Sequence, residues 1–193
     1  MVDNLSIMKQ CEAFLEGHFL LSSGLHSGGY CQCAKLLRFP DLAAQVLAAV
    51  AEQVKDLGIT KVCGPAMGGV LVSYELSRQL GLESIFTERK DGEMQLRRGF
   101  SVGPGDKVLI AEDVITTGKS TLETVKALEA LGASVIGAAC IVDRRGTDCA
   151  FTLPVYPALK LDIQTYDPSE CPLCAQGKVQ LQKPGSREAL GQA

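Results

Sequence analysis

The sequence predicts an α/β fold in which a mainly parallel central sheet is flanked by helices. Through the middle of the 193-residue chain, short apolar segments alternate with segments of helical periodicity. The apolar segments are nearly continuous instead of alternating with polar residues, which is typical of parallel strands buried on both faces. A chain of this length favours one domain, which we divide into a segment at about 1–40, a core at 41–165 and a polar tail at 166–193.

The expected elements follow one another in a regular order. Helical spacing occurs first in 3–16, ahead of a glycine- and serine-rich stretch, 17–30, with the composition of loops and hairpins. Apolar segments then predict strands at 61–63, 84–87, 107–111, 133–142 and 153–163. Helical patterns cover 41–57, 70–80 and 120–131.

Start and stop signals bound these three core helices. Asp41 follows Pro40 and can cap the first helix, and either Ser120 or Thr121 can cap the third. A glycine follows each helix, at positions 58, 81 and 132, where it can end the helical backbone.

Composition and charge exclude several classes of function. The net charge is −3 and the pI is about 5.5, so no basic field attracts nucleic acid and we expect no nucleic-acid partner. The longest uncharged apolar run, 133–142, is too short to cross a bilayer, and no secretory signal is recognisable. Eight cysteines in such a chain indicate thiols in a reducing compartment, so we expect a cytoplasmic protein.

Three loops leave the carboxyl ends of predicted strands. Ligands of parallel sheets bind beyond the carboxyl ends of the strands. The loops that leave such ends cover 64–69, 112–120 and 143–146. We therefore expect these three loops to converge on one site.

The segment 108–120, V-L-I-A-E-D-V-I-T-T-G-K-S, has the composition of a site for a phosphorylated sugar. Ionised Glu112 and Asp113 only accept hydrogen bonds, which suits the two free hydroxyls of a ribose. The backbone amides of 116–120 and the helix N-terminus that follows suit a 5′-phosphate, and Gly118 allows a tight turn. The alternative is a simple helix cap preceded by solvated loop acids.

The same segment does not form a nucleotide-triphosphate loop. Gly118, Lys119 and Ser120 resemble the end of such a loop. The loop also needs a glycine five positions before Gly118, and Asp113 stands there instead. Because a carboxylate at that point repels a triphosphate, we exclude this class.

Four segments are similar to those of a known family. E-D-V-I-T-T-G-K-S, 112–120, resembles the ribose-phosphate motif of the type I phosphoribosyltransferases. Three others resemble segments of the members that act on orotate: F-L-L-S-S-G-L-H-S-G-G-Y, T-E-R-K-D-G-E-M-Q-L-R-R-G-F and I-V-D-R-R-G. The resemblance runs over about 15–165 and implies the type I phosphoribosyltransferase fold with a small N-terminal hood.

The resemblance also implies how phosphoribosyl diphosphate is bound. Glu112 and Asp113 correspond to the acids that bind the ribose hydroxyls. The loop 63–69 corresponds to one that touches diphosphate; some family members carry a lysine there, where this chain has Gly68. A plain strand-to-helix turn is the alternative for that loop. The full implied set for this substrate is Glu112, Asp113, Val114, Ile115, Thr116, Thr117, Gly118, Lys119 and Ser120.

For orotate, the resemblance implies Thr116 and Arg144 as ligands. A guanidinium group can hold a planar carboxylate through two parallel hydrogen bonds, which suits an acidic base. Arg145 is the alternative ligand, and a surface arginine after a strand is the alternative role for Arg144.

The implied catalytic residues are Arg89, Lys90 and Asp113. Arg89 and Lys90 lie in the charged segment 88–100, which resembles a mobile loop that reaches the active site of the neighbouring subunit. Its central Asp91-Gly92 predicts a β-hairpin, and a solvated charged hairpin without catalytic role is the alternative. Asp113 is the nearest candidate for a general base, if the reaction uses one.

As a whole, the resemblance implies transfer of a phosphoribosyl group from phosphoribosyl diphosphate to orotate in pyrimidine biosynthesis, with Mg²⁺, by a homodimer. Two alternatives stay open. One is a phosphoribosyltransferase for another base, although the arginines at 144 and 145 favour an acidic one. The other is a non-catalytic sensor of phosphoribosyl diphosphate, for which we find no basic helix-turn-helix pattern.

Cys171 and Cys174 have the C-x-x-C spacing of zinc ligands, and Cys31-x-Cys33 could complete a set of four. A reversible disulfide and inert thiols are the alternatives, and we expect no resident metal. Two aromatic residues of the segment 17–30, His26 and Tyr30, could cover the pyrimidine ring. The alternatives for them are an exposed histidine and a half-buried tyrosine.

Overall fold

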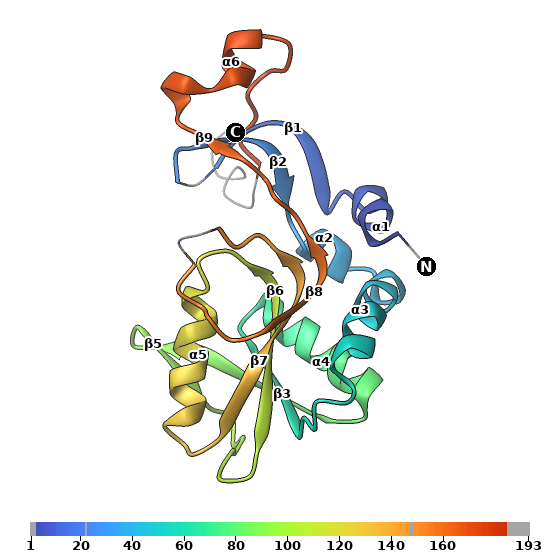
Figure 1. Ribbon diagram of the computed structural model, residues 1–193, viewed down its shortest axis with the longest axis vertical. Helices are drawn as coiled ribbons and strands as arrows, with labels where there is room; N and C mark the ends of the chain where they lie inside the picture. The colour runs from blue at the N-terminus through green and yellow to red at the C-terminus, as the bar shows by residue number, and fades with distance from the viewer. Residues whose placement is uncertain (1–2, 22, 147–148, 185–193) are drawn as a thin grey trace, which may run out of the picture.

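The computed structural model describes residues 3–21, 23–146 and 149–184, and these residues form two sheets (Figure 1). A six-stranded sheet has the order β5-β4-β3-β6-β7-β8, and a three-stranded sheet has the order β1-β2-β9. The larger sheet is the centre of the core. The smaller sheet, with the segments 12–33 and 164–184 that build it, is called the hood and lies above the core in Figure 1.

The central sheet is parallel except at one edge, which confirms the predicted α/β fold. Strand β5 pairs antiparallel with β4, and all other neighbours are parallel. The strands are β3 (Lys61–Pro65), β4 (Glu83–Lys90), β5 (Glu93–Leu96), β6 (Lys107–Ile115), β7 (Ser134–Asp143) and β8 (Val155–Lys160).

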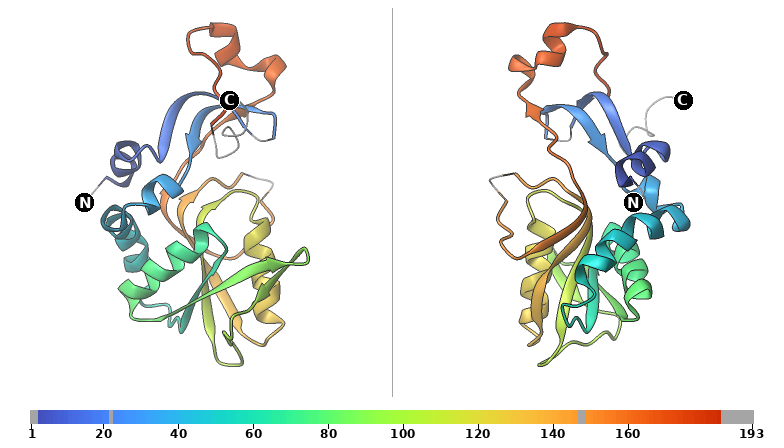
Figure 2. Two further views of the ribbon diagram at one scale, coloured as in Figure 1. Left: turned by 180° about the vertical axis from the view of Figure 1, so that it is seen from behind. Right: turned by 45° about the vertical axis from the view of Figure 1, so that its right-hand side comes forward.

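Helices cover both faces of this sheet. Helices α3 (Pro40–Val54) and α4 (Gly68–Leu80) lie on one face and α5 (Lys119–Glu129) lies on the other, as the right-hand view of Figure 2 shows. Strand β6 illustrates why both faces are apolar: Leu109 packs toward α3 and α4, and the next residue, Ile110, packs toward α5. Within the described residues, none of the helices has the length and apolar character that crossing a bilayer requires.

Two elements differ from the predicted boundaries near the strand ends. Strand β6 continues beyond Ala111 to Ile115, because Val114 and Ile115 pair with the neighbouring strand β7. Helix α5 is preceded by Gly118, with a left-handed φ of 72°, so neither Ser120 nor Thr121 is its cap. The predicted cap was wrong because the Ser120 hydroxyl donates a hydrogen bond to Glu112 instead.

The hood joins the N-terminal part of the chain to its C-terminal part. Helix α1 (Asn4–Gln10) is shorter than the helical spacing in 3–16 suggests, because β1 (Phe14–Leu20) follows it. The remaining elements of this region are β2 (His26–Cys31), α2 (Ala34–Leu37), β9 (Thr165–Tyr166), a 3₁₀ turn (Pro168–Glu170) and α6 (Pro172–Gln176). Because β9 pairs with β2, the described part of the polar tail is built into the hood.

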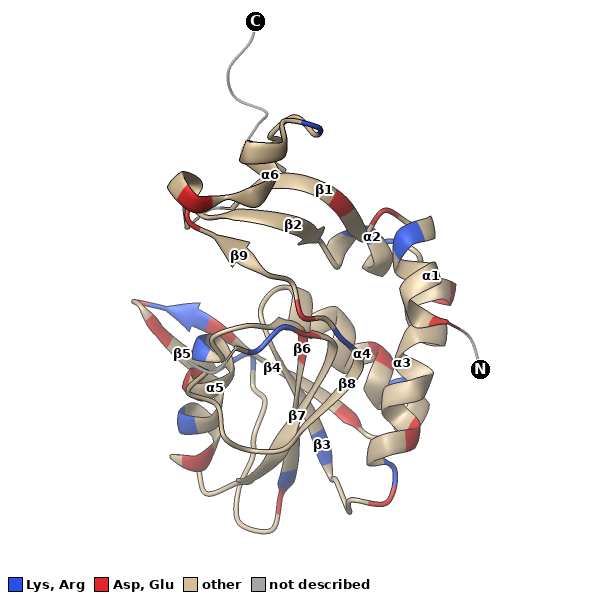
Figure 3. Ribbon diagram, turned by 45° about the horizontal axis from the view of Figure 1, so that its top comes forward, with Lys and Arg blue, Asp and Glu red and all other residues tan. Residues whose placement is uncertain are grey.

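The predicted β-hairpin is present between β4 and β5. Lys90 pairs with Glu93, which leaves Asp91 and Gly92 as the two turn residues, with φ angles of 54° and 88°. Two successive positive φ angles define the turn that matches the twist of a two-residue hairpin. The hairpin projects from the side of the core, and its projecting end carries both basic and acidic residues (Figure 3).

Candidate active site

A cleft of about 800 Å³ lies between the carboxyl ends of the central strands and the hood. Thr116 and Thr117 enter it from the loop between β6 and α5, and 143–146 line it from the end of β7. The hood contributes Ser23 and Thr165. The cleft is therefore where a parallel sheet is expected to bind its ligand, and the hood forms its opposite wall.

Glu112 and Asp113 are buried carboxylates at the end of β6, not solvated loop acids. Glu112 is only 6% exposed, and burial is the main cause that raises its pKa to about 7, with a smaller contribution from the charge of Asp113. The hydroxyl of Ser120 donates to Glu112 Oε1 at 2.8 Å and opposes this shift. Burial also raises the pKa of Asp113, whose Oδ1 accepts from the Val114 amide at 2.9 Å. Two desolvated acids of this kind favour a ligand that donates hydrogen bonds.

The loop between β3 and α4 packs so closely on β6 that it requires glycine. A Cβ on Gly68 would lie 2.5 Å from the carboxylate carbon of Asp113, and one on Gly69 would lie 2.6 Å from the carbonyl oxygen of Ala111. A Cβ on Gly64 would lie 2.0 Å from the carbonyl oxygen of Gly69. The loop also contains a cis peptide bond between Ala66 and Met67. The loop 64–69 and the loop 112–120 therefore meet at Asp113, as predicted for the strand ends.

The turn before α5 places a helix N-terminus at the cleft. Gly118 has a left-handed backbone, and a Cβ there would lie 2.6 Å from the Cβ of Phe151. Among the residues that the structure describes, no side chain caps this helix. The first amides of an uncapped helix are ready donors for an anion.

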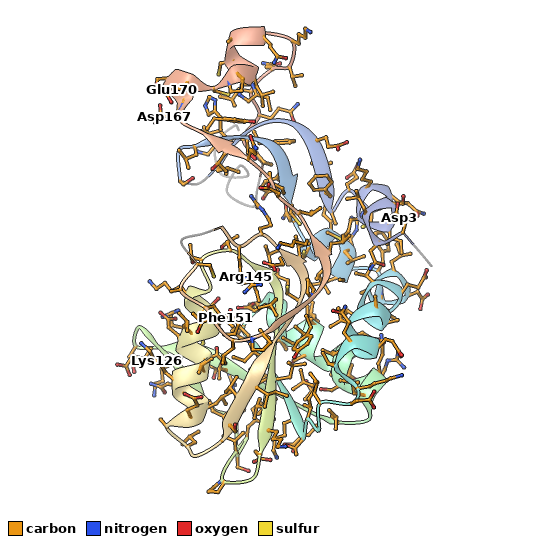
Figure 4. All side chains as sticks on the ribbon, viewed as in Figure 1. Asp3, Lys126, Arg145, Phe151, Asp167 and Glu170 are labelled. Carbon is orange, nitrogen blue, oxygen red and sulfur yellow. The ribbon has the colours of Figure 1, made fainter. Side chains whose placement is uncertain are left out.

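The two arginines after β7 have different surroundings. Arg145, labelled in Figure 4, donates to both carboxylate oxygens of Asp143 at 2.9 Å from Nε and Nη2. Arg144 lines the cleft, its amide donates to the Ile115 carbonyl at 2.9 Å, and its buried Nε has no hydrogen-bond partner within the described part of the chain. Arg144 is therefore the arginine with donors available to a ligand. Its contact with Ile115 also brings the third predicted loop, 143–146, to the other two.

The structure does not bring the predicted catalytic cations to this cleft. Arg89 pairs with Glu123 of α5 and donates to the Gly92 carbonyl, so its side chain is held along its own hairpin. In the described residues, neither Arg89 nor Lys90 lines the cleft. The other two basic residues of the segment, Arg97 and Arg98, both pair with Glu88.

Some residues that line the cleft were not predicted. Lys160, Asp162 and Ile163 belong to the end of β8 or follow it, and Ser23 and Thr165 come from the hood. This first group was missed because the strand was predicted to run to residue 163, whereas β8 ends at Lys160, so these residues were counted as strand and not as part of the site at its carboxyl end. Ser23 lies in the segment 19–30 that resembles the family, although no role was predicted for it, and Thr165 reaches the cleft through the pairing of β9 with β2.

One expectation for the hood needs correction, and one alternative is confirmed. His26 is 6% exposed and faces His18 and Cys174, so it is not an exposed histidine, and it is not among the described residues that line the cleft. Tyr30 is half-buried, with its hydroxyl 3.5 Å from Gln32 Oε1.

The suggestion that Cys31 and Cys33 complete a zinc site with Cys171 and Cys174 was also wrong. The sulfur atoms of Cys31 and Cys33 lie 3.8 Å apart. They lie beside Asp113, whose carbonyl oxygen is 3.6 Å from Cys33 Sγ. Within the described residues, the possible metal ligands gathered around Cys171 and Cys174 are His18 and His26. The spacing alone could not show this, because the histidines lie about 150 residues away.

The fold and the site define a class of α/β protein whose strand ends suit an anionic, hydroxyl-rich ligand. Comparison with known proteins narrows this class. The family model described as "Phosphoribosyl transferase domain" matches residues 35–149. The orotate phosphoribosyltransferase of Caldicellulosiruptor saccharolyticus is 50% identical over 184 residues, which are 95% of this chain and 96% of that protein. The chain therefore belongs to the phosphoribosyltransferase family, which confirms the resemblance.

Solved structures show the same fold at lower identity. The orotate phosphoribosyltransferase of Aeropyrum pernix has a TM-score of 0.70 at 24% identity, over 81% of this chain and 92% of that one. The adenine phosphoribosyltransferase of Rhodothermus marinus has a TM-score of 0.61 at 22% identity, over 82% of this chain and 100% of that one. The type I phosphoribosyltransferase fold is thus confirmed. Because enzymes for different bases share it, the fold alone does not determine the base.

Proposed function

We propose that this protein transfers the 5-phosphoribosyl group from 5-phosphoribosyl 1-diphosphate to orotate, giving orotidine 5′-monophosphate and diphosphate in pyrimidine biosynthesis. The observation that carries the proposal is the 50% identity, over 95% of the chain, to a curated orotate phosphoribosyltransferase. The buried, unpartnered Arg144 Nε supports an acidic base, since a cation in such a place gains most from an anionic ligand.

Residues 112–120 bind the ribose 5-phosphate part in this proposal. Glu112 and Asp113 accept hydrogen bonds from the two ribose hydroxyls, for which two buried carboxylates are suited. The uncapped amides of 117–120 and the helix dipole of α5 hold the 5′-phosphate. The sugar carbon that reacts then points toward the loop 64–69, where Gly68 and Gly69 let backbone amides approach the diphosphate.

Thr116 and Arg144 hold orotate on the other side of the reacting carbon. Both line the cleft, and the Arg144 amide is tied to the end of β6, so the arginine is positioned relative to the ribose site. The N1–C1 bond forms while the C1–oxygen bond to diphosphate breaks and its electron pair leaves with the diphosphate. Positive charge builds on the ribose ring, as in glycoside cleavage. Asp113 is the nearest protein base if N1 arrives protonated.

Mg²⁺ is part of the proposal. Carboxylate oxygens suit a hard cation, and Glu112 and Asp113 are two neighbouring carboxylates near the end of β6. Glu112 and Asp113 would hold the ion together with diphosphate, ribose hydroxyls and water. When bound, it neutralises part of the charge on the departing diphosphate.

We further propose a cytoplasmic homodimer in which Arg89 and Lys90 serve the neighbouring subunit. The hairpin projects from the side of the core (Figure 3), and among the described residues none from 88–96 lines the cleft of the same chain. Three large apolar residues beside the loop 64–69 are unusually exposed: Met67 at 84%, Leu71 at 53% and Tyr74 at 68%. Such a patch marks an interaction surface, and here it adjoins Asp113 in an apolar pocket.

The test is to follow the loss of orotate absorbance with phosphoribosyl diphosphate and Mg²⁺, with adenine, hypoxanthine and uracil as controls. We expect turnover with orotate and none above background with the others. Preference for another base would contradict the choice of substrate. Binding of phosphoribosyl diphosphate without turnover of any base would instead support a sensor.

A further inference from the structure

We propose that His18, His26, Cys171 and Cys174 form a structural zinc site at the far end of the hood. One donor atom from each of these residues lies within 4.8 Å of all the others. The set joins β1, β2 and the C-terminal segment, and it is separate from the cleft, since none of the four residues lines it. The inference does not depend on the transferase activity.

The distances between the donor atoms fit a tetrahedral ion. His18 Nε2 lies 3.1 Å from His26 Nδ1, 3.5 Å from Cys171 Sγ and 3.7 Å from Cys174 Sγ, and Cys174 Sγ lies 3.3 Å from His26 Nδ1. Zinc–sulfur and zinc–nitrogen bonds at tetrahedral angles require donor separations of about 3.3 to 3.8 Å. Two thiolates and two imidazoles in this geometry form a closed zinc site of the structural kind.

The surroundings of His18 orient its ring for a metal. Its Nδ1 lies 3.2 Å from the carbonyl oxygen of Val179, a contact in which the ring nitrogen must be the donor. The proton then resides on Nδ1, and the lone pair of Nε2 points to the other three ligands. Metal-bound histidines typically donate their second ring N–H to a carbonyl or carboxylate in this way.

The backbone places the two histidines on one face of the hood. Leu20 pairs with His26 across the two strands, and His18 lies two residues from Leu20, on the same side of β1. The pairing register shifts between Glu16 and Phe19, so that a bulge adjoins His18. Bulges of this kind re-aim a side chain and are common next to functional sites.

The C-terminal segment closes over that face. Tyr166 pairs with His26, and further along the chain Gln182 donates to the His18 carbonyl at 2.8 Å and accepts from the Leu20 amide at 2.7 Å. Cys171 and Cys174 lie between these two anchor points, at the start and within α6. In Figure 4 the turn that carries Asp167 and Glu170 leads from β9 into this helix.

The hood needs such a link because it lacks a hydrophobic core there. Neither of the two apolar clusters includes any described residue from 15–30 or from 165–184. Yet His18, His26 and Cys171 are 2%, 6% and 3% exposed, so polar donors occupy the interior that apolar side chains would otherwise fill. Small units without a sufficient core are commonly held by a metal. The ion would fix β9, and with it Thr165 in the wall of the cleft.

The first test is the metal content of the purified full-length protein, measured by inductively coupled plasma mass spectrometry. We expect about one zinc per chain. Cys174→Ser and His26→Ala should each lose at least about tenfold in zinc affinity, since even changes to groups that support a ligand have effects of this size. Cys31→Ser is the matched control, because Cys31 is a half-buried hood thiol outside the set, and it should keep its zinc.

A second test uses the unaltered protein and so does not depend on whether the variants fold. After removal of metal under reducing conditions, Co²⁺ should give the absorption of a tetrahedral thiolate complex. Zn²⁺ should protect Cys171 and Cys174, but not the half-buried Cys31 and Cys149, from alkylation. Absence of both Co²⁺ absorption and Zn²⁺ protection would overturn the proposal. Equal loss of zinc in Cys31→Ser and Cys174→Ser would overturn this ligand set.

Discussion

Glu112 illustrates how one buried side chain can link ligand binding to pH. Its pKa is about 7, well above the usual 4.5, because burial disfavours the charged form. In the ligand-free protein, this shift lowers the stability as pH rises from about 4.5 to about 7, by up to about 3 kcal/mol. A ribose whose hydroxyls donate to the carboxylate favours the ionised form and reverses the effect.

We therefore expect phosphoribosyl diphosphate to bind more tightly as pH rises toward 7, with release of a proton from Glu112 at about pH 6. Calorimetry in two buffers of different ionisation enthalpy measures the number of protons released. Because the phosphates of the ligand also titrate, Glu112→Gln is the reference, and it should release about one proton fewer. Equal proton counts for the two proteins would show that this carboxyl group does not ionise on binding.

Substitutions of the adjacent Arg144 and Arg145 should affect different properties, the first ligand affinity and the second stability. Arg144→Ala removes a guanidinium group whose Nε has no described partner, from a residue that lines the cleft. It should lower the affinity for orotate by about 10- to 100-fold and change the affinity for phosphoribosyl diphosphate little. Arg145→Ala should mainly lower the melting temperature, because it leaves the buried Asp143 carboxylate without its two 2.9 Å hydrogen bonds. Calorimetric titration with each ligand, together with thermal unfolding, distinguishes the two. An equal loss of affinity for both ligands in Arg144→Ala would contradict its role.

For single residues, the sequence predicted which residue types lie at the strand ends but not which side chains form hydrogen bonds with one another. The motif placed two acids at a strand end, and Glu112 and Asp113 are there. Nothing in R-R-G tells which arginine bonds to Asp143, because neighbouring residues of the same chemistry are separated only by the direction of each side chain. The bond from Ser120 to Glu112 depends on the turn at Gly118, whose left-handed backbone displaced the predicted helix cap.

Among the elements, the turn between β6 and α5 depends most on a single glycine. Gly118→Ala would force a side chain into a φ of 72° and bring its Cβ within 2.6 Å of Phe151. The helix N-terminus must then shift, and we expect at least tenfold weaker phosphoribosyl diphosphate binding, an estimate for loss of about one good hydrogen bond to a charged group. Gly105→Ala is the control, since Gly105 also has a positive φ, 96°, but open space around it. Isothermal titration of both variants should show that only Gly118→Ala weakens binding.

For the β4–β5 hairpin, we expect Lys90→Ala to lower kcat by about one hundredfold or more while the melting temperature is unchanged, because a well-placed cation stabilises the departing diphosphate. Within the described chain, the Lys90 ammonium forms no ion pair whose loss could unfold the protein. Lys126→Ala removes an exposed cation on α5, labelled in Figure 4, and should keep its activity. Normal kcat in steady-state kinetics of Lys90→Ala would remove this residue from the mechanism.

Element order was predictable because apolar periodicity and glycine stops are local signals. The helices α3 and α4 and the Asp91-Gly92 hairpin lie close to their predicted positions, although α3 ends at Val54 and Asp41 lies in its first turn instead of capping it. The extension of β6 was missed because it depends on pairing with β7, and the hood was only partly predicted because β9 reaches β2 from nearly 140 residues away in the sequence. Pairing between strands far apart in the sequence does not show in the hydrophobic periodicity of a short stretch of residues.

The whole molecule divides its tasks between a rigid core and a less apolar hood. The core clusters fix the strand ends that hold Glu112, Asp113 and Arg144. The hood supplies the other wall of the cleft but takes little of its stability from apolar packing near His18 and Cys171. Neither part brings Arg89 or Lys90 to the cleft of the same chain, so in the described structure the site lacks these two cations.

If a second subunit supplies Lys90, two inactive variants should restore each other. In a dimer of Lys90→Ala with Glu112→Gln, one cleft combines an intact Glu112 with the intact Lys90 of the other chain, and the second cleft lacks both groups. Random pairing of co-expressed chains makes half the dimers mixed, so about one quarter of the wild-type activity should return. In the proposed dimer, the exposed Met67, Leu71 and Tyr74, in and just after the loop 64–69, would provide the surface for such pairing. Because a cation acting within its own chain would leave every cleft defective, activity no higher than that of the separate variants would contradict the shared site.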